Sequence, residues 1–266
     1  MEDSSVITEV RHGAMWITLN RPAAMNAISP DVVAGVGRAL DEALARDDAR
    51  VIVLTGAGRA FCAGADLKFV RGETQGQAQS QANGSAQFLG ALLALLNRLE
   101  RFPRPVIAAV NGLALAGGLE LVLCCDLVLA TQSARFGDAH ANYGLLPGGG
   151  GSVRLPRRIG AARAKHLMFT GDFVAAEAME TAGLVNQVVE DGRLVEAVDA
   201  LVAKIAAKSP LGISRMKTLV NDGLEQPVEV ALRQELVMTA LHEHSEDIAE
   251  GLAAFQEKRA PRFTGR

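Results

Sequence analysis

Short apolar runs separated by glycine- and proline-containing turns occupy most of the chain before residue 192. Runs of this length that are rich in β-branched residues predict buried strands. A strand, a turn and a helix recur with VIVLTG, PVIAAVNG, DLVLA and LVNQVV, at a spacing of roughly 50 residues, which predicts a stacked or spiral α/β core. The expected strands are residues 6–10, 14–20, 51–55, 106–110, 127–131 and 134–137.

Helical periodicity is clear in two parts of this core. Apolar residues at helical spacing predict a helix that begins after Ser29, which can cap it, with Pro30 in its first turn. A second helix is expected over residues 88–101. The polar, low-complexity residues 72–87 between them predict a mobile surface loop or a weak helix.

The chain beyond residue 191 is different, because no strand pattern returns there. We therefore expect a core of residues 1–191 and a C-terminal helical region of residues 192–266. A run of consecutive helices at the end of an α/β chain is suited to oligomerisation and to covering an active site. The helices expected there are residues 194–208, 211–222, 228–244 and 248–258.

Composition and charge narrow the class of protein. The chain has 266 residues, 49% of them hydrophobic, and a formal net charge of −3 at pH 7. This mild acidity is unlike the basic surface of nucleic-acid-binding proteins, so no nucleic-acid partner is expected. One basic cluster, Arg154, Arg157 and Arg158, is interpreted as a solvated face. Without a membrane-length apolar run or a secretory signal, we expect no membrane association and a cytoplasmic location.

The three cysteines are Cys62, Cys124 and Cys125. An odd count with an adjacent pair is not typical of a disulfide framework, and the spacing does not match a zinc site. Cys124 and Cys125 lie in the apolar run LVLCCDLVLA. We therefore expect packed, buried thiols and no metal ion.

Two glycine-rich turns, residues 61–67 and 116–120, each follow an expected strand and precede a helix. Small residues let a ligand approach the backbone, and a helix N-terminus offers unpaired N–H groups. Two such turns brought together could aim two N–H groups at one oxygen and stabilise a developing oxyanion. Neither turn matches a phosphate-binding template, so a nucleotide-binding fold is set aside.

Six motifs carry a resemblance to a known family. LNRPAAMNAIS, GAGRAFCAGADL, NGLALAGGLELVLCCDLVLA, FGDAHANYGLLPGGGGSVRLPRRIG, AAEAMETAGLVNQVV and FQEKRAPRFTGR resemble the enoyl-CoA hydratase/isomerase (crotonase) superfamily in order and spacing. The resemblance implies an α/β fold, a crotonase-type spiral of repeated ββα units with a C-terminal helical region. It also implies a homotrimer or a dimer of trimers that acts on an acyl-CoA substrate. Coenzyme A is then part of the substrate, and no separate cofactor is expected.

The resemblance also implies roles for individual residues. The two oxyanion-hole N–H groups would belong to Ala65 and Gly117, and Lys258 would meet a CoA phosphate of an adjacent subunit. For Lys258 the alternative is an exposed lysine at a helix end. The remaining CoA-binding positions are Ala24, Asn26, Ala63, Asp66 and Leu67. The acyl pocket would be shaped by Met25, Phe69, Phe88, Leu92 and the polar residues 72–87.

The acid–base residues match the family only in part. Two glutamates are typical of its hydratases; Glu120 matches the first, but His140 stands where the second is expected. Histidine exchanges protons near neutral pH, so a Glu120–His140 pair could serve as acid and base. Glu120 would position or deprotonate water, and His140 would donate or accept the substrate proton. Asp138 and Asn142 flank His140 on a segment expected to be strand-like, where Asp138 could orient the imidazole.

Three functions follow from this departure. The first is a lyase that adds water to an enoyl thioester. The second is a hydrolase of a carbon–carbon or thioester bond with His140 as its base. The third is a non-catalytic acyl-CoA-binding relative. Dehalogenation is disfavoured, because the turn of residues 148–151 contains only glycine and so lacks the carboxylate that halide-expelling relatives use there.

Overall fold

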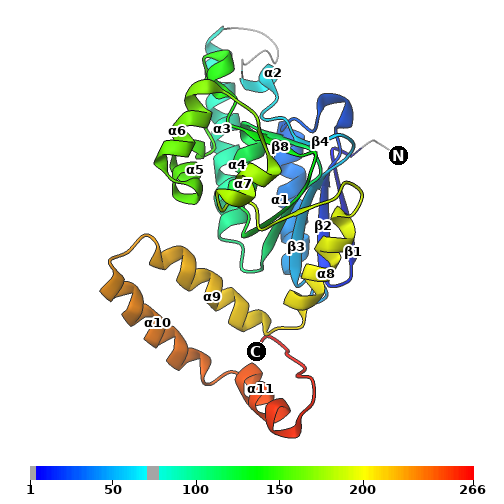
Figure 1. Ribbon diagram of the computed structural model, residues 1–266, viewed down its shortest axis with the longest axis vertical. Coiled ribbons are helices and arrows are strands. Elements are labelled where there is room, and N and C mark those ends of the chain that lie inside the picture. Colours follow the sequence, from blue (N-terminus) through cyan, green and yellow to red (C-terminus); the bar gives the residue numbers. More distant parts are fainter. Residues whose placement is uncertain (1–3, 71–77) are drawn as a thin grey trace.

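Two sheets and a surrounding layer of helices form the core of the molecule (Figure 1). The computed structural model describes residues 4–70 and 78–266, and for residues 78–83 it describes the backbone only. The six strands of the larger sheet lie in the order β1-β2-β3-β5-β7-β10, and the four of the smaller sheet in the order β4-β6-β8-β9. The strands are β1 Val6–Arg11, β2 Ala14–Leu19, β3 Val51–Gly56, β4 Ala60–Cys62, β5 Val106–Val110, β6 Leu113–Leu115, β7 Leu127–Thr131, β8 Arg135–Gly137, β9 Val174–Ala175 and β10 Gln187–Val189.

The order of the strands reveals the repeating unit. From β2 to β10 the neighbours in the larger sheet are parallel, and β4, β6 and β8 are parallel in the smaller sheet. Each unit therefore adds one strand to each sheet before a helix returns the chain, as in β3-β4, β5-β6 and β7-β8. This is the spiral of ββα units that the family resemblance implied.

The helices agree with the predicted pattern in most places. α1 begins at Pro30, and the Ser29 side chain accepts a hydrogen bond from the N–H of Val32 at 3.4 Å, as expected for a cap. The helices are α1 Pro30–Leu44, α2 Leu67–Val70, α3 Ala78–Glu100, α4 Gly117–Leu123, α5 Gly151–Ile159, α6 Ala161–Thr170, α7 Ala176–Thr181, α8 Leu194–Ala206, α9 Pro210–Gly223, α10 Val228–His242 and α11 Glu246–Glu257, with short 3₁₀ helices η1 Pro22–Ala24 and η2 His140–Tyr143.

Two predictions about local structure need correction. The helix expected over residues 88–101 begins earlier, at Ala78, because the polar residues before Phe88 continue it as α3. Of the segment predicted as a loop or weak helix, residues 72–77 lie outside the described residues. The segment around His140 is not strand-like, since β8 ends at Gly137 and η2 follows it.

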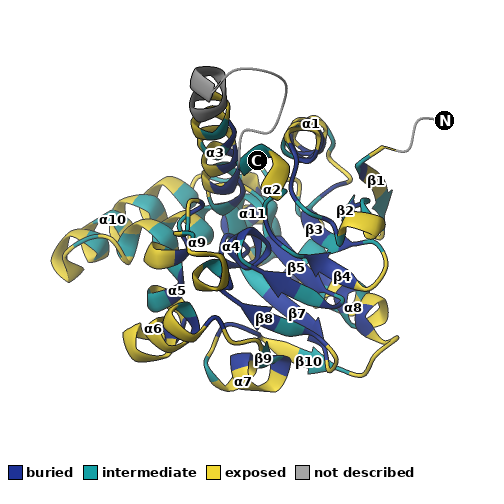
Figure 2. Ribbon diagram, turned by 90° about the horizontal axis from the view of Figure 1, so that it is seen from above, coloured by how far each residue is buried: buried dark blue, intermediate teal, exposed yellow. Residues whose placement is uncertain are grey.

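The central strands of the larger sheet are buried on both faces. Alternate residues of β3 point to opposite sides, so that Ile52 and Leu54 join the main core while Val51 and Val53 face a second cluster. Helix α8 covers that second face through Val198 and neighbouring residues. In Figure 2 the central strands are mostly dark blue and the outer faces of the helices are yellow. α8 therefore packs as part of the core, although it follows the boundary predicted at residue 191.

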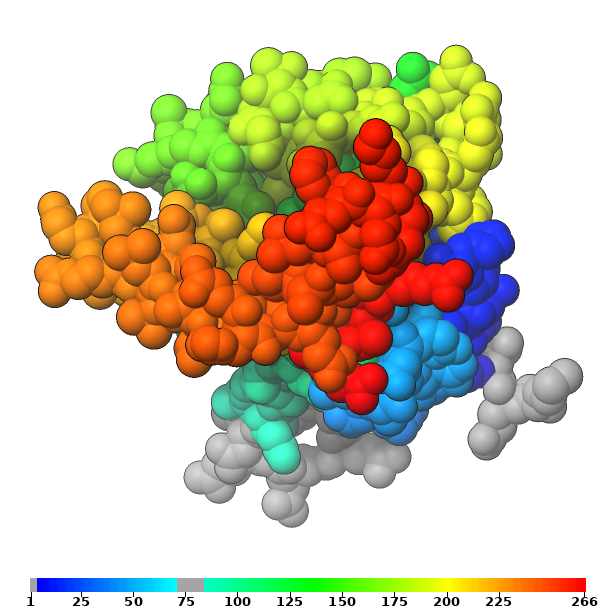
Figure 3. Space-filling model, turned by 90° about the horizontal axis from the view of Figure 1, so that it is seen from below, coloured from blue at the N-terminus to red at the C-terminus, as the bar shows by residue number. Residues whose placement is uncertain are grey.

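Helices α9, α10 and α11 extend away from the sheets (Figure 1). These helices and the C-terminal segment, residues 210–266, form an arm. The arm is held against the core by the ion pair of Lys217 with Asp126 at 2.7 Å and by Arg50, which donates to the carbonyl of Phe263 at 2.8 Å. Figure 3 shows α10, in orange, projecting from one side and the red C-terminal segment lying beside the blue residues. Large apolar side chains are exposed along the arm: Met216, Val220, Leu224, Val228, Leu232, Leu236, Val237, Leu241, Leu252 and Phe255.

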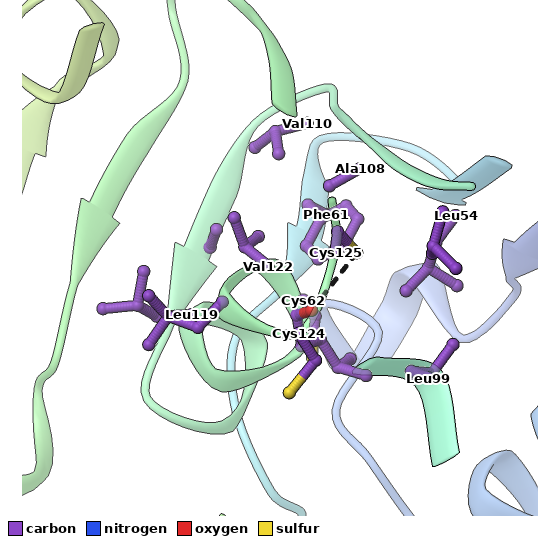
Figure 4. Close-up of a cluster of buried hydrophobic side chains, with 14 of the residues drawn as sticks. Leu54, Phe61, Cys62, Leu99, Ala108, Val110, Leu119, Val122, Cys124 and Cys125 are labelled. Atoms are coloured by element: carbon purple, nitrogen blue, oxygen red, sulfur yellow. Dashed lines mark hydrogen bonds between the residues drawn. The ribbon is translucent and has the colours of Figure 1, made fainter. Parts of the chain in front are cut away.

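The three cysteines are free and buried, and for Cys124 and Cys125 this burial was predicted (Figure 4). Cys124 and Cys125 follow α4 and pack in the main core with Cys62 of β4. Burial raises the pKa of Cys62 and of Cys124 to about 12, so both thiols stay protonated at neutral pH. In residues 4–70 and 78–266, no helix has the length and apolar character needed to cross a bilayer.

Candidate active site

The two glycine-rich turns meet at the ends of neighbouring strands. β4 and β6 are parallel, so the turns that follow them emerge at the same edge of the smaller sheet. A Cβ atom added to Gly117 would lie 3.1 Å from the backbone nitrogen of Ala65. In the part of the chain that the structure describes, neither the Ala65 N–H nor the Gly117 N–H donates a hydrogen bond to the protein. The two predicted oxyanion-hole donors are therefore adjacent and unused.

Backbone strain holds this arrangement. Ala116, immediately before α4, has a φ of 47°, and Gly64, immediately before Ala65, has a φ of 115°. A positive φ in a residue other than glycine, asparagine or aspartate is uncommon and often marks a functional site. Gly118 has a different purpose, because a Cβ atom there would collide with the carbonyl of Cys62. A side chain at Gly117 would crowd the Ala65 nitrogen and one at Gly118 would collide with the Cys62 carbonyl, so both positions favour glycine.

Glu120 lies one turn into α4 and is only 3% exposed. Its Oε1 atom accepts hydrogen bonds from the N–H groups of Gly149 at 2.8 Å and Gly151 at 2.9 Å. Burial raises the pKa of Glu120 above its usual value, although the Gly151 N–H and the nearby His140 act in the opposite direction. A buried carboxylate with a raised pKa is typical of a general acid or base.

His140 is oriented by Asp138. Its Nδ1 atom lies 3.0 Å from Oδ1 of Asp138, and their side chains are only 11% and 3% exposed. Burial lowers the pKa of His140, but the hydrogen bond and charge of Asp138, together with the charge of Glu120, outweigh it and raise the pKa overall. This pair orients the ring in the way that the sequence suggested, although the backbone is a 3₁₀ turn. Asn142 instead donates to the carbonyl of Gly171 at 3.0 Å.

Glu120, Asp138 and His140 form one cluster. A Cβ atom added to Gly151 would lie 3.2 Å from Oε1 of Glu120 and 3.4 Å from Oδ2 of Asp138. Gly151 thus lies between the two carboxylates, and the charges of Glu120 and His140 each shift the other's pKa. Since Glu120 and Gly117 share α4, the cluster adjoins the free backbone donors.

The predicted CoA-binding segments lie beside the Ala65 turn, which Ile28 joins through a β-bridge. Asn26 is fully buried, and its side chain donates to the carbonyls of Ala57 and Ala60 and accepts from the N–H of Arg21. Its side chain therefore fastens two loops together, and its backbone N–H is also used, since it donates to the carbonyl of Arg21 at 2.9 Å. Asp66 is likewise paired with Arg21 at 2.9 Å.

The other predicted CoA-binding positions are more accessible. Ala24 and Leu67 are exposed, and Ala63 is half-buried. Lys258 is exposed and caps α11 with a φ of 55°. α11 lies at the opposite end of the molecule from α2, so Lys258 is remote from the Ala65 turn of its own chain (Figure 1).

The predicted acyl pocket contains an aromatic pair. The ring centroids of Phe69 in α2 and Phe88 in α3 are 6.0 Å apart. Leu92, one turn further along α3, is 1% exposed, and Met25 is half-buried. Residues 72–77 of the predicted polar rim lie outside the described residues.

Sequence reasoning missed one residue beside the site. Arg154 was interpreted as part of a solvated face, but its side chain is only 13% exposed and it donates to the carbonyl of Gly149 at 2.8 Å. Arg157, with a side chain 57% exposed, fits the solvated interpretation. The signal in the sequence was the position of Arg154 just after the four glycines, where a long donor can reach back to the loop.

Fold and site together define a crotonase-type enzyme that processes acyl-CoA. The chain matches the enoyl-CoA hydratase/isomerase family over residues 9–266 and belongs to that family. The crotonyl-CoA hydratase of Syntrophomonas wolfei is 35% identical, with 99% of each chain covered. The 1,2-epoxyphenylacetyl-CoA isomerase of Escherichia coli is also 35% identical, with 98% of each chain covered.

A solved structure supports the same assignment. The crystal structure of enoyl-CoA hydratase from Bacillus anthracis matches with a TM-score of 0.90 at 34% identity and covers 98% of this chain and 100% of that chain. The protein is therefore an enoyl-CoA hydratase/isomerase-like enzyme, which sets aside a non-catalytic role. Because its relatives include hydratases and an isomerase, family membership alone leaves the particular reaction open.

Proposed function

We propose that the protein adds water across the double bond of an enoyl-CoA thioester, with Glu120 and His140 as its acid–base pair. The observation that carries this proposal is the cluster in which Glu120 is held by the Gly149 and Gly151 amides and His140 by Asp138. Hydration needs two groups of this kind, one to take a proton from water and one to deliver a proton to carbon.

The proposed reaction begins with the thioester carbonyl bound between the N–H groups of Ala65 and Gly117. Glu120 takes a proton from water as the water oxygen forms a bond to the β-carbon, and the electron pair of the double bond moves to the carbonyl oxygen. The two N–H groups stabilise this enolate, since they are fixed in place before charge develops. Protonated His140 then donates its Nε2 proton to the α-carbon, which gives a 3-hydroxyacyl-CoA. A proton passing from Glu120 to His140 restores the starting state.

The coenzyme A part of the substrate would lie along the segments that carry Ala24, Asn26, Ala63, Asp66 and Leu67, and the enzyme would need no other cofactor. We further propose a homotrimer or dimer of trimers. The exposed apolar side chains of α9–α11 support this assembly, because they would be buried by a neighbouring subunit. The distance of Lys258 from its own site is consistent with a contact to the CoA phosphate of an adjacent subunit.

A second candidate is hydrolysis of a carbon–carbon or thioester bond with His140 as general base. The Asp138–His140 hydrogen bond favours it, because a carboxylate that orients histidine is the usual arrangement where histidine activates a nucleophile. Glu120 distinguishes the two reactions, since the hydrolase has less need for a second, amide-bound carboxylate.

The test is a comparison of substrates with the purified protein. Short and medium enoyl-CoA thioesters are followed by the ultraviolet absorbance of their conjugated bond, and cyclic β-diketones and saturated acyl-CoA thioesters by product formation. Hydration predicts a rapid loss of absorbance with the enoyl-CoA and formation of 3-hydroxyacyl-CoA. Cleavage of a β-diketone or release of free CoA, with the enoyl-CoA unchanged, would replace hydration with the hydrolase function.

A further inference from the structure

A loop of four consecutive glycines, residues 148–151, supplies both amides that hold Glu120. Glycine has more backbone freedom than any other residue, so such a loop has little intrinsic preference for one conformation. Gly150 has a φ of 95°, and side chains at Gly149 or Gly150 would collide with Glu120, Leu96 or Arg154. Residues 149 and 150 must therefore be glycine to fit, and something other than the loop's own side chains must fix its conformation.

Arg154 is the side chain that reaches this loop. One end of its guanidinium, Nη1, donates to the carbonyl oxygen of Gly149 at 2.8 Å. That carbonyl belongs to the peptide between the two amides that bind Glu120, so its direction governs where both N–H groups point. The Arg154 backbone N–H also donates to the carbonyl of Gly150 at 2.8 Å. One residue thus bonds two successive carbonyls of the loop.

The rest of the guanidinium is anchored to α3. Nε lies 3.1 Å from both carboxylate oxygens of Glu100, while Nη2 donates to Glu100 at 2.8 Å and to Asn97 at 2.7 Å. The Arg154 side chain is 13% exposed and that of Glu100 is 36% exposed, so this ion pair is screened less than a fully exposed pair. The fork geometry of arginine allows it to bind a carboxylate and a carbonyl at once, which lysine cannot do equally well.

We propose that Arg154, anchored by Glu100 and Asn97, is a positioning residue that fixes the four-glycine loop as the receptor for the Glu120 carboxylate. It acts through the Gly149 and Gly151 amides, so Arg154 itself need not touch substrate. This inference rests on the proposed function only in so far as Glu120 is the base. The hold of the loop on Glu120 is a property of the folded protein and can be measured without any reaction.

The first test is hydrogen exchange of the backbone amides of residues 148–151 in the full-length protein, followed by mass spectrometry. In Arg154→Met we expect the Gly149 and Gly151 amides to exchange at least about ten times faster than in the parent, because their closed conformation has lost its tether. Arg157→Met, a change to an exposed arginine on the same helix, is the matched control and should leave this exchange unchanged.

The second test is the pH profile of the enzyme. Arg154→Met is expected to lower kcat about 10- to 100-fold with KM changed by less than about 3-fold. It should also move the acid limb of kcat/KM to higher pH, because the amides that favour the ionised carboxylate loosen and because the positive charge of Arg154, which interacts with Glu120, is lost. Arg154→Lys should recover part of both effects. If Arg154→Met changes the melting temperature but neither the kinetic constants nor the pH profile, Arg154 has only a structural role.

The outcomes separate the two proposals. If the parent enzyme does not hydrate enoyl-CoA but Arg154→Met still accelerates exchange of the loop amides, the proposed reaction fails and the positioning role stands. If Arg154→Met and Arg154→Lys leave both the amide exchange and the acid limb unchanged, the positioning role is overturned. Should Arg154→Met not fold, Arg154→Lys decides by the same two measurements.

Discussion

Glycine-rich turns of this enzyme present two pairs of backbone N–H groups, and the two pairs are used differently. The Ala65 and Gly117 amides are free among the described residues, whereas the Gly149 and Gly151 amides are bound to the protein's own Glu120. In the proposed mechanism, the first pair is directed at charge that develops on the substrate, and the second at charge that resides on the base. The comparison teaches that the same backbone device can stabilise a transition state or position a catalyst, depending on whether a carboxylate fills it.

The geometry of each pair of amides follows from the elements that hold it. The first pair comes from turns at the ends of two adjacent parallel strands, β4 and β6, and is held by the strained φ of Ala116. The second pair lies on a loop with no strand beneath it and depends on a side chain, Arg154, for its conformation. We therefore expect backbone changes to disrupt the first pair of amides and side-chain changes to disrupt the second pair.

Replacing Glu120, the carboxylate bound by the Gly149 and Gly151 amides, should have the largest effect on activity. Glu120→Gln keeps a side-chain oxygen for both amides but removes the base, so we expect kcat/KM to fall about 1,000-fold or more. The melting temperature should stay the same or rise, because burial disfavours the charged carboxylate. The matched control is Glu177→Gln, which changes an exposed glutamate in the first turn of another helix, α7. Loss of stability without loss of activity in Glu120→Gln would reduce Glu120 to a structural role.

Filling the space beside the Ala65 and Gly117 amides should have the next largest effect on activity. In Gly117→Ala the added methyl group would lie 3.1 Å from the Ala65 nitrogen, where the substrate oxygen has to approach. We expect kcat/KM for enoyl-CoA to fall about 100-fold, as when one oxyanion donor is lost. Gly148→Ala is the control, because its methyl group meets only the flexible end of Leu89, at 3.3 Å, and should change kcat/KM by less than about 3-fold. Equal activities of the two variants would exclude an oxyanion hole at Gly117.

The smallest effects are expected in the pH dependence of activity, which should be bell-shaped in the parent enzyme. Glu120 must be ionised to act as base, so activity falls as pH drops through its raised pKa, above the ordinary value of 4.5. His140 must be protonated to act as acid, so activity falls as pH rises through its raised pKa, above the ordinary value of 6.5. Since the two groups interact, the limbs report the pair.

Asp138→Asn tests this assignment of the alkaline limb. Asp138 supplies the hydrogen bond and charge that raise the pKa of His140, so its replacement should move the alkaline limb to lower pH. We expect kcat to fall about 10-fold, because the imidazole also loses its orientation. The limb is measured from kcat/KM across pH. If it stays in place in Asp138→Asn, the alkaline limb does not report the titration of His140.

Much of the fold could be predicted because its strands are short β-branched runs between turn residues, as in β3 and β5. The start of α3 was missed because residues 78–87 are polar and low in complexity, and their helical conformation depends on continuity with the apolar part beyond Phe88. The 3₁₀ turn at His140 was missed because its backbone is set by Ala139 in a left-handed conformation, with a φ of 58°, which alanine rarely adopts.

The site could be predicted where one motif carried both position and chemistry, as with Gly117 and Glu120. It could not be predicted where the chemistry depends on contacts between distant segments. Arg154 looked like a surface residue because its partners, Glu100 and Asn97, are more than fifty positions away in the sequence. Asn26 had the right position for a CoA contact, but its side chain is used to join loops.

The central claim is that Glu120 and His140 together hydrate an enoyl thioester, and the most direct measurement is the loss of enoyl-CoA absorbance with the parent enzyme and with His140→Gln. His166→Gln, a change to a histidine whose side chain is 65% exposed, is the control. The account predicts rapid loss with the parent and control enzymes, and a rate reduced about 100-fold or more in His140→Gln. Hydration that continues at the parent rate in His140→Gln would contradict the proposed acid–base pair.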